Sequence, residues 1–297
     1  MIKKIDNIQK YTFIIISLFS LVFYIGLDFS FKANTQNYIL FILVSLVGIP
    51  HGLFDLSIGR KIFKKYFNAW FIIFTVSYIS ISALYLTTWV LFPEPALIFF
   101  LAIAAYHFGY EDYNYLSKNK INYRNINIFI KGLIIVMAPI IFHYDEVREL
   151  FSILINSDFR YHDFSQNNKI LFLTFSFAYI IFDNKSSLVN KTEGLVSIVN
   201  FILLPPIISF VLYFCFLHSI RHFIESILIL KNVPKGYSIK YFIFLTVTIS
   251  LVTSIISIIL FSNLYQLSIN ETIIKYIFMV LACLTLPHMI FNMWPKK

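Results

Sequence analysis

Five histidines lie inside long apolar stretches that otherwise carry almost no charge. They are His51, His107, His218, His222 and His288. An imidazole in hydrocarbon is costly, so a histidine within a membrane segment is a candidate functional residue. Neutral imidazole is also the most frequent metal ligand in proteins. The five histidines together therefore predict a metal site.

Acidic residues follow three of these histidine positions at helical spacing. His218 and His222 are spaced i, i+4, which puts two imidazoles on one helix face, as two ligands of one metal require. The acidic neighbours are Asp55 after His51, Glu111 and Asp112 after His107, and Glu225 after His222. A metal-bound imidazole usually donates its second N–H to a carboxylate, and we expect these acids to take that role. His288 has no acid nearby in the sequence, which makes it the weakest candidate ligand.

The remaining histidines and the cysteines fit structural roles. His143 and His162 flank a polar joint and are expected to be solvated loop residues. Cys215 and Cys283 lie in apolar stretches without paired spacing, so we interpret them as buried small side chains. None of the four is predicted to bind the metal.

The composition is that of an integral membrane protein. The chain is 59% hydrophobic and 13% charged, with a mean hydropathy of +0.77, whereas a soluble domain carries roughly 25% charged residues. Apolar segments follow one another with short polar joints, which predicts an all-α bundle forming a single domain over 1–297. The net charge of +9 comes from basic residues at segment ends, so it indicates membrane orientation and anionic lipid, and not nucleic acid. The lysine-rich N-terminus lacks a small-residue cleavage site and is interpreted as an anchored first helix.

Ten segments approach the ~20 apolar residues that cross a bilayer. They are 11–30, 38–58, 68–92, 95–116, 127–143, 169–183, 188–204, 206–231, 238–262 and 271–293. Prolines at 93–95 and 205–206 predict tight turns between segments. The stretch 144–168 mixes acids with apolar positions at helical spacing, which predicts an interfacial helix or an ordered loop.

The distribution of the 24 Lys and Arg residues orients these segments. Only Lys32, Arg148, Arg160 and Lys169 fall at joints of one side, and three more lie within segments. All others fall at the alternate joints and the two termini, which the positive-inside rule assigns to the cytoplasm. The sequence therefore predicts a multi-pass protein of the inner (cytoplasmic) membrane, with about ten spans and both termini cytoplasmic.

The five histidines share one depth in this topology. Each lies on a segment that runs from outside to inside, between 8 and 13 residues before the next inside basic residue. At 1.5 Å per residue, all of them lie roughly 12–20 Å from that boundary. Scattered core histidines have no reason to align, so the agreement predicts one common site.

Ligand type alone leaves iron, copper, zinc and nickel open. The chain has 34 Phe and 19 Tyr, which can wall a site for an apolar substrate. Iron with open coordination positions fits this setting best, because O2 and a lipid-soluble substrate both partition into the bilayer. A membrane di-iron oxygenase acting on lipids would carry several HxxH or HxxxH boxes, and only one such pair occurs. A metal or proton-coupled transporter would show repeats and histidines spread across the membrane, whereas the histidines of this chain share one depth.

Four stretches also carry a family resemblance. Residues 48–55 (GIPHGLFD), 106–112 (YHFGYED), 218–225 (HSIRHFIE) and 286–289 (LPHM) together resemble the Brp/Blh family of bacterial and archaeal β-carotene 15,15′-dioxygenases. The resemblance implies Fe(II)-dependent cleavage by O2 of the central double bond of β-carotene or a related carotenoid. Two all-trans-retinal molecules would result and supply a rhodopsin.

The resemblance also implies roles for individual residues. His51, His107, His218 and His222 match the iron ligands, while His288 matches a histidine that either supports the ligands or faces substrate. Asp55, Glu225 and one of Glu111 and Asp112 would orient the imidazoles. Tyr106 and Phe108 flank a ligand, and because they lie on one helix, at most one of them can face the substrate. A carotenoid is about as long as the ~30 Å hydrocarbon core, so we expect it to enter from the bilayer between helices.

Overall fold

The computed structural model describes residues 2–26, 32–116, 124–182, 187–224, 239–265 and 267–293, and every regular element among them is helical. The helices are α1 (Ile2–Leu21), η1 (Val22–Gly26), α2 (Ala33–Leu43), η2 (Val44–Gly48), η3 (Ile49–Phe54), α3 (Asp55–Phe63), α4 (Trp70–Leu91), α5 (Pro93–Leu116), α6 (Arg124–Phe142), α7 (Tyr144–Ile155), α8 (Gln166–Ile181), α9 (Leu188–Leu203), α10 (Pro206–Val211), η4 (Leu212–Ser219), α12 (Ile239–Tyr265) and α13 (Ile269–Met293). The predicted all-α class is confirmed.

Helices occupy the predicted segments wherever the structure describes them. The segment expected over 68–92 is α4, for example, and the one expected over 271–293 is α13. Pro93 and Pro206 each begin a helix, because the missing N–H of proline costs nothing in a first turn. The stretch 144–168 combines both predicted forms, since α7 is followed by an ordered connection before α8.

Several helices are long and apolar enough to cross a membrane. Within the described residues they are Asn7–Gly26, Trp70–Leu91, Pro206–Ile224 and Ile269–Asn292. The pair Ile126–Phe142 and Tyr144–Ile155 passes the same test jointly but bends by 106° between its halves. These helices support a membrane protein, while the ten-span count and the cytoplasmic termini stay predictions.

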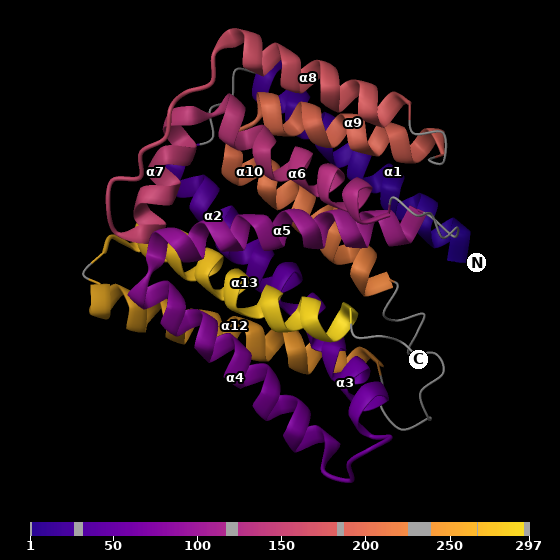
Figure 1. The fold of residues 1–297 in the computed structure, drawn as a ribbon, viewed down its shortest axis with the longest axis vertical. Helices are drawn as coiled ribbons and strands as arrows, with labels where there is room; N and C mark the ends of the chain where they lie inside the picture. The colour runs from indigo at the N-terminus through magenta and orange to yellow at the C-terminus, as the bar shows by residue number, and fades with distance from the viewer. Residues whose placement is uncertain are drawn as a thin grey trace.

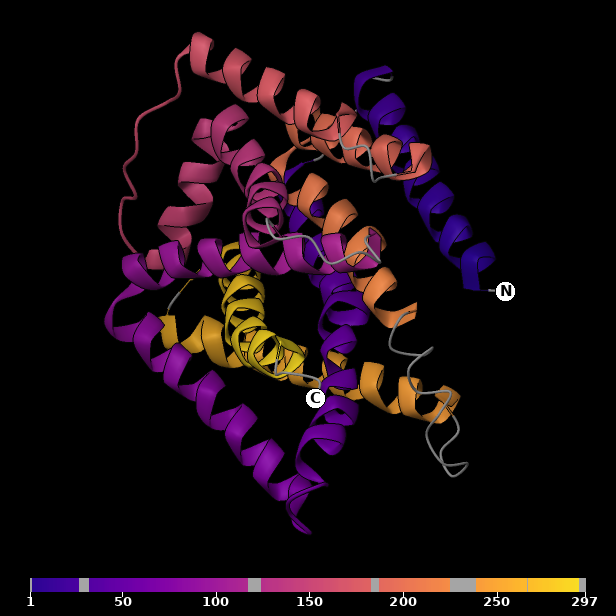
Figure 2. The ribbon, with the colours of Figure 1, turned by 45° about the vertical axis from the view of Figure 1, so that its right-hand side comes forward.

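The bundle is organised around a central group of helices. Helices α1, α8 and α9 lie on one side, α3, α4 and α12 lie on the opposite side, and α5, α10 and α13 run between them (Figures 1 and 2). Helix α7 stands across the ends of α5 and α13. Helices α5 and α13, with η4 that continues α10, supply much of the core, including the buried side chains of Leu97, Ile277 and Tyr213.

Two glycines bring α5 and α6 into backbone contact. A Cβ on Gly109 would lie 1.8 Å from the carbonyl oxygen of Ile128, and one on Gly132 would lie 1.6 Å from that of Ala105. Small residues allow such close approach of membrane helices, where packing drives association. The contact fixes the position of α5, and therefore of His107, two residues before Gly109.

Within the described residues, three of the predicted segments are not regular α-helices throughout, contrary to expectation. In the segment 11–30, the π-helical turn η1 follows α1. In the segment 38–58, the π-helical turn η2 and the 3-10 turn η3 separate α2 from α3, and in the segment 206–231 the π-helix η4 follows α10. Pro50 gives a reason for the break in the segment 38–58, since it lacks an N–H and its ring clashes with the carbonyl four residues earlier. His51 lies in η3 and His218 in η4. Departures of this kind are frequent at functional sites.

Candidate metal centre

Four of the five predicted histidines meet in the interior. His107 lies on α5, His218 on η4, His222 on the α-helical residues 220–224 that continue η4, and His288 on α13. Their exposed fractions are 5%, 1%, 6% and 3%, in that order. The ring centroid of His107 lies 4.8 Å from that of His218 and 5.0 Å from that of His288, whose ring lies 5.1 Å from His222. The predicted convergence of these four residues is therefore observed.

The closest nitrogens have a separation suited to a metal. Nε2 of His107 lies 3.1 Å from Nε2 of His218. With a metal–nitrogen bond of ~2.1 Å, two ligands at a right angle are about 3.0 Å apart. The two imidazoles can therefore bind one ion with little movement. Without an ion, the same distance is that of an N–H···N hydrogen bond.

An acid from a distant part of the chain holds His288. Nδ1 of His288 donates to the carboxylate of Asp55, at 2.8 Å from Oδ1 and 2.9 Å from Oδ2. The hydroxyl of Tyr78 donates to the same carboxylate at 3.0 Å, and the amide of Asn292 lies 3.0 Å from Nε2 of His288. His288 therefore has an acidic partner in the fold, although no acid lies near it in the sequence. Asp55 lies 233 positions away, and only the folded contact between α3 and α13 brings the two together.

The remaining predicted acids and His51 are described to different extents. Glu111 contributes a ligand atom within 4.8 Å of those of His107 and His288, so a metal could be held by these three residues. Asp112 and His51 lie in described helices, but their side chains fall outside the description. Glu225 lies outside the described residues. The predicted support of His51, His107 and His222 by acids thus stays a prediction.

A buried ion pair fixes the helix that carries two of the histidines. Nη2 of Arg221 lies 2.6 Å from Oε2 of Glu193 on α9, and the two side chains are 3% and 4% exposed. Arg221 falls between His218 and His222 in the sequence. Breaking a buried pair leaves an uncompensated charge, which is costly. The pair therefore ties the histidine-bearing helix to α9.

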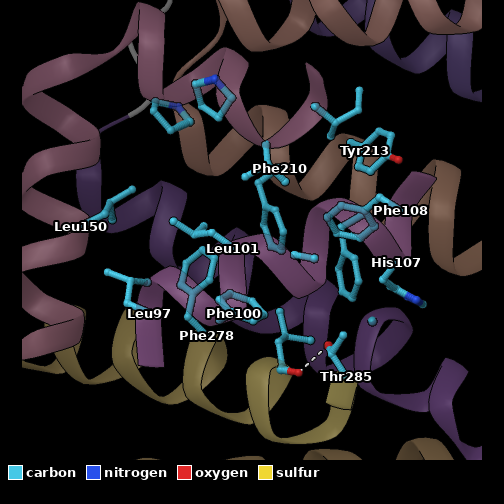
Figure 3. A pocket seen from close by; sticks show the side chains of 18 of the residues that line it. Leu97, Phe100, Leu101, His107, Phe108, Leu150, Phe210, Tyr213, Phe278 and Thr285 are labelled. Carbon is cyan, nitrogen blue, oxygen red and sulfur yellow. Dashed lines mark hydrogen bonds between the residues drawn. The ribbon is translucent and has the colours of Figure 1, made fainter. Parts of the chain in front are cut away.

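An apolar cavity opens beside the histidines (Figure 3). It leaves about 140 Å³ for the centre of a water-sized sphere, roughly ten times the space that one water needs. His107 and Thr285 lie at one end of the view and Leu150 at the other, with Phe100, Phe210 and Phe278 between them. The side chains of His107, His288, Tyr78, Tyr213 and Thr285 supply its few polar groups. Such a lining suits an apolar ligand that contacts polar side chains at one end of the cavity.

The two aromatic residues beside His107 differ in their orientation. Phe108 lines the cavity, and its ring centroid lies 5.0 Å from that of His218. Tyr106 is not among the residues that line the cavity, and its ring stacks on Tyr110 at 6.3 Å. Of the two, only Phe108 faces the cavity, in agreement with the expectation that at most one of them would.

None of the residues predicted to be uninvolved lines the cavity, and one of them has a different setting from the one expected. His162 is exposed, whereas Cys215 is fully buried and Cys283 is half-buried, and neither forms a disulfide. His143 is not a solvated loop residue, because it is half-buried at the bend between α6 and α7. Its Nε2 bonds to the carbonyl oxygen of Phe201 at 3.1 Å. His143 therefore has a structural role, which its position beside a polar joint in the sequence did not indicate.

Sequence reasoning missed Tyr78, Glu193 and most of the cavity lining. Tyr78 and Glu193 act through contacts between distant segments, which no local pattern signals. The lining did leave a signal, because apolar residues recur at i, i+3, i+4 and i+7 on α5 before His107. This spacing is equally typical of ordinary packing between helices, so it does not identify a cavity by itself.

Comparisons with known proteins agree with the family indicated by the four sequence stretches. A family model described as β-carotene 15,15′-dioxygenase matches residues 42–295. A curated protein named β-carotene 15,15′-dioxygenase, from uncultured marine bacterium 66A03, is 29% identical over 255 residues, covering 84% of this chain and 90% of that protein. No solved structure matches the chain.

Proposed function

Because the chain belongs to the β-carotene 15,15′-dioxygenase family, we propose that its histidine cluster holds one Fe(II) ion beside a bound carotenoid. The protein is an enzyme of carotenoid cleavage that forms retinal from β-carotene. The observation that carries the iron proposal is the 3.1 Å approach of the His107 and His218 Nε2 atoms at one end of an apolar cavity.

The proposed iron ligands are His51, His107, His218 and His222. Neutral imidazoles suit iron as well as other transition metals, so the choice of iron rests on the reaction with O2 and on family membership. His288 lies beside these ligands, with Nδ1 held by Asp55. We assign it to positioning the cluster and the reacting part of the substrate.

The reaction needs no reductant. The central C=C bond of β-carotene breaks, each of its two carbons gains one oxygen atom of O2, and two C=O bonds form. An iron ion held by these histidines would supply the binding and activation of O2. The chain's own residues keep water out, since the cavity beside the histidines is walled largely by phenylalanine and aliphatic side chains. They also place the polyene against the histidines, where Phe108 and Phe214 lie within 5.0 and 5.7 Å of the His218 ring.

The membrane setting follows from the apolar helices. We propose ten spans in an inner membrane, with both termini cytoplasmic, and a multi-pass protein that takes β-carotene and O2 directly from the bilayer. The alternation of basic joints supports this topology. The beginning of α1 and the end of α13 also lie on the same side of the bundle, opposite α7 (Figure 1). The retinal product would pass to a rhodopsin.

Expression in β-carotene-producing cells tests the proposed function. Cells that carry the wild-type chain should lose their colour and accumulate retinal, with two retinal molecules formed per β-carotene consumed. Cells that carry His218→Ala should stay coloured, and cells that carry His162→Ala should behave as wild type, because His162 is exposed and far from the cluster in the sequence. Colour loss without retinal would contradict the proposal.

A further inference from the structure

Three helices lead along the cavity to the histidines. On α5 the lining runs from Leu97 through Phe100, Leu101 and Ala104 to His107. On α13 it runs from Phe278 through Leu281 and Thr285 to His288. On α10 and η4 it runs from Ile207 through Phe210 to Phe214, which lies one turn before His218. On both α5 and α13 the last residue of the stripe lies 10 positions after the first, which is a rise of about 15 Å at 1.5 Å per residue. The cavity is therefore an apolar trough of roughly that length, with the histidines at one end.

Helix α7 closes the opposite end of this trough. Val147, Leu150, Phe151 and Leu154 line the cavity, and their i, i+3, i+4, i+7 spacing makes up one face of α7. The 106° bend after α6 turns α7 across the ends of α5 and α13 (Figure 1). Leu150 lies at the end of the cavity opposite His107 (Figure 3).

Hydrogen bonds hold α7 in place at both ends. At its C-terminal end, the indole N–H of Trp89 donates to the carbonyl oxygen of Leu154 at 3.3 Å, and Nζ of Lys275 donates to Oδ1 of Asn156 at 2.5 Å. At its N-terminal end, His143 bonds to the carbonyl oxygen of Phe201 at 3.1 Å. These partners belong to α4, α13 and α9, so the wall has a fixed distance from His288 on α13.

We propose that α7 is the end stop of the substrate trough, and that its distance from the histidines determines which double bond is cut. This inference rests on the proposed function. A carotenoid is about as long as the ~30 Å hydrocarbon core, so half of it matches the ~15 Å trough. With one ring of β-carotene against Leu150 and Phe151, the central double bond lies at the histidines. O2 then cuts the chain into equal halves, each ending in a new C=O group.

Shortening Leu150 tests this arrangement through the lengths of the products. In Leu150→Ala and in Leu150→Ala/Phe151→Ala, the ring can move farther from the histidines. We expect retinal to be joined by an unequal pair of products from cleavage of the neighbouring double bond. One is an aldehyde longer than retinal by one double-bond repeat. The other is shorter by the same repeat and is a methyl ketone, because its carbon of the cleaved bond carries a methyl group. Chromatography with mass spectrometry of products from purified enzyme and β-carotene resolves all three. Leu150→Trp should keep its bound iron but turn over β-carotene more slowly.

Ile155→Ala is the matched control. Ile155 lies on α7 and is 5% exposed, but it does not line the cavity, so its truncation removes similar bulk from the same helix. It should give retinal alone. Retinal as the sole product of the folded double variant, or the same unequal pair from Ile155→Ala, would overturn the end stop. Failure of the proposed function gives a different result, because the wild-type enzyme would then form no retinal in the same assay.

Discussion

Replacing Asp55 by asparagine tests how the buried acid acts on the metal centre. The carboxylate accepts hydrogen bonds from Nδ1 of His288 at 2.8 and 2.9 Å and from the hydroxyl of Tyr78 at 3.0 Å. Asparagine keeps the size and one acceptor oxygen but removes the charge. We expect His288 to lose its fixed orientation, so that turnover falls while the iron ligands themselves remain in place.

The contact geometry sets the size of the expected loss. The side chains of Asp55 and His288 are 2% and 4% exposed, so water does not screen the interaction. A buried hydrogen bond to a charged group contributes about 1.5–3 kcal/mol. At about 1.36 kcal/mol for each factor of ten in rate, that corresponds to a loss of roughly 10–150-fold. The range overlaps the 10–100-fold typical of residues that support a metal ligand.

A double-variant comparison measures whether Asp55 acts through His288. Turnover and bound iron, both per folded protein, are compared among Asp55→Asn, His288→Ala and the double variant. If the two residues form one unit, the double variant loses no more turnover than His288→Ala alone, since coupled residues are not additive. Tyr78→Phe is the control, because it removes one donor and leaves the charge, and it should lose less.

Two outcomes would refute this reasoning. Losses that multiply in the double variant would mean that Asp55 does not work through His288. Unchanged turnover and iron per folded Asp55→Asn molecule, together with lower expression or thermal stability, would give Asp55 only a structural role, such as settling a helix end near Arg60 and Lys61.

Four further substitutions test the helix packing and the membrane topology. Gly109→Ala should lower the yield of folded protein sharply, because its Cβ would lie 1.8 Å from a carbonyl oxygen of α6; a normal yield would contradict the close helix contact. Glu193→Gln should destabilise the protein by about 3–5 kcal/mol, measured by thermal unfolding, because it leaves Arg221 charged and buried. An unchanged midpoint of thermal unfolding would contradict a stabilising role of the ion pair. Single cysteines at Ser117 and Ser165 should be labelled from opposite sides of the membrane, and labelling from the same side would break the ten-span topology.

The fold class and the residues of the cluster follow from the sequence. Apolar segments of spanning length predict helices, and the structure has helices at those positions because backbone groups in an apolar environment must bond within their own segment. The shared depth of His107, His218, His222 and His288 correctly predicts that they meet. This inference works because a membrane fixes the direction of each helix, so position along the sequence converts directly to depth.

The lateral contacts do not follow from the sequence. Depth places Asp55 and His288 at similar heights, but nothing in either segment indicates that α3 and α13 are neighbours. For the same reason nothing in the sequence around Arg221 indicates that it pairs with Glu193 on α9. The π-helix that carries His218 and the bend that turns α7 across the cavity also depend on packing between distant segments.

Iron content and turnover, measured together on purified protein, test the central claim most directly. Wild-type protein and His162→Ala, loaded with Fe(II), should each bind one iron per chain and convert β-carotene to retinal. His51→Ala, His107→Ala, His218→Ala and His222→Ala should each lose both the iron and the activity. Normal iron content and turnover in any of these four variants would remove that residue from the metal site, and the same result in all four would contradict the histidine-bound iron centre.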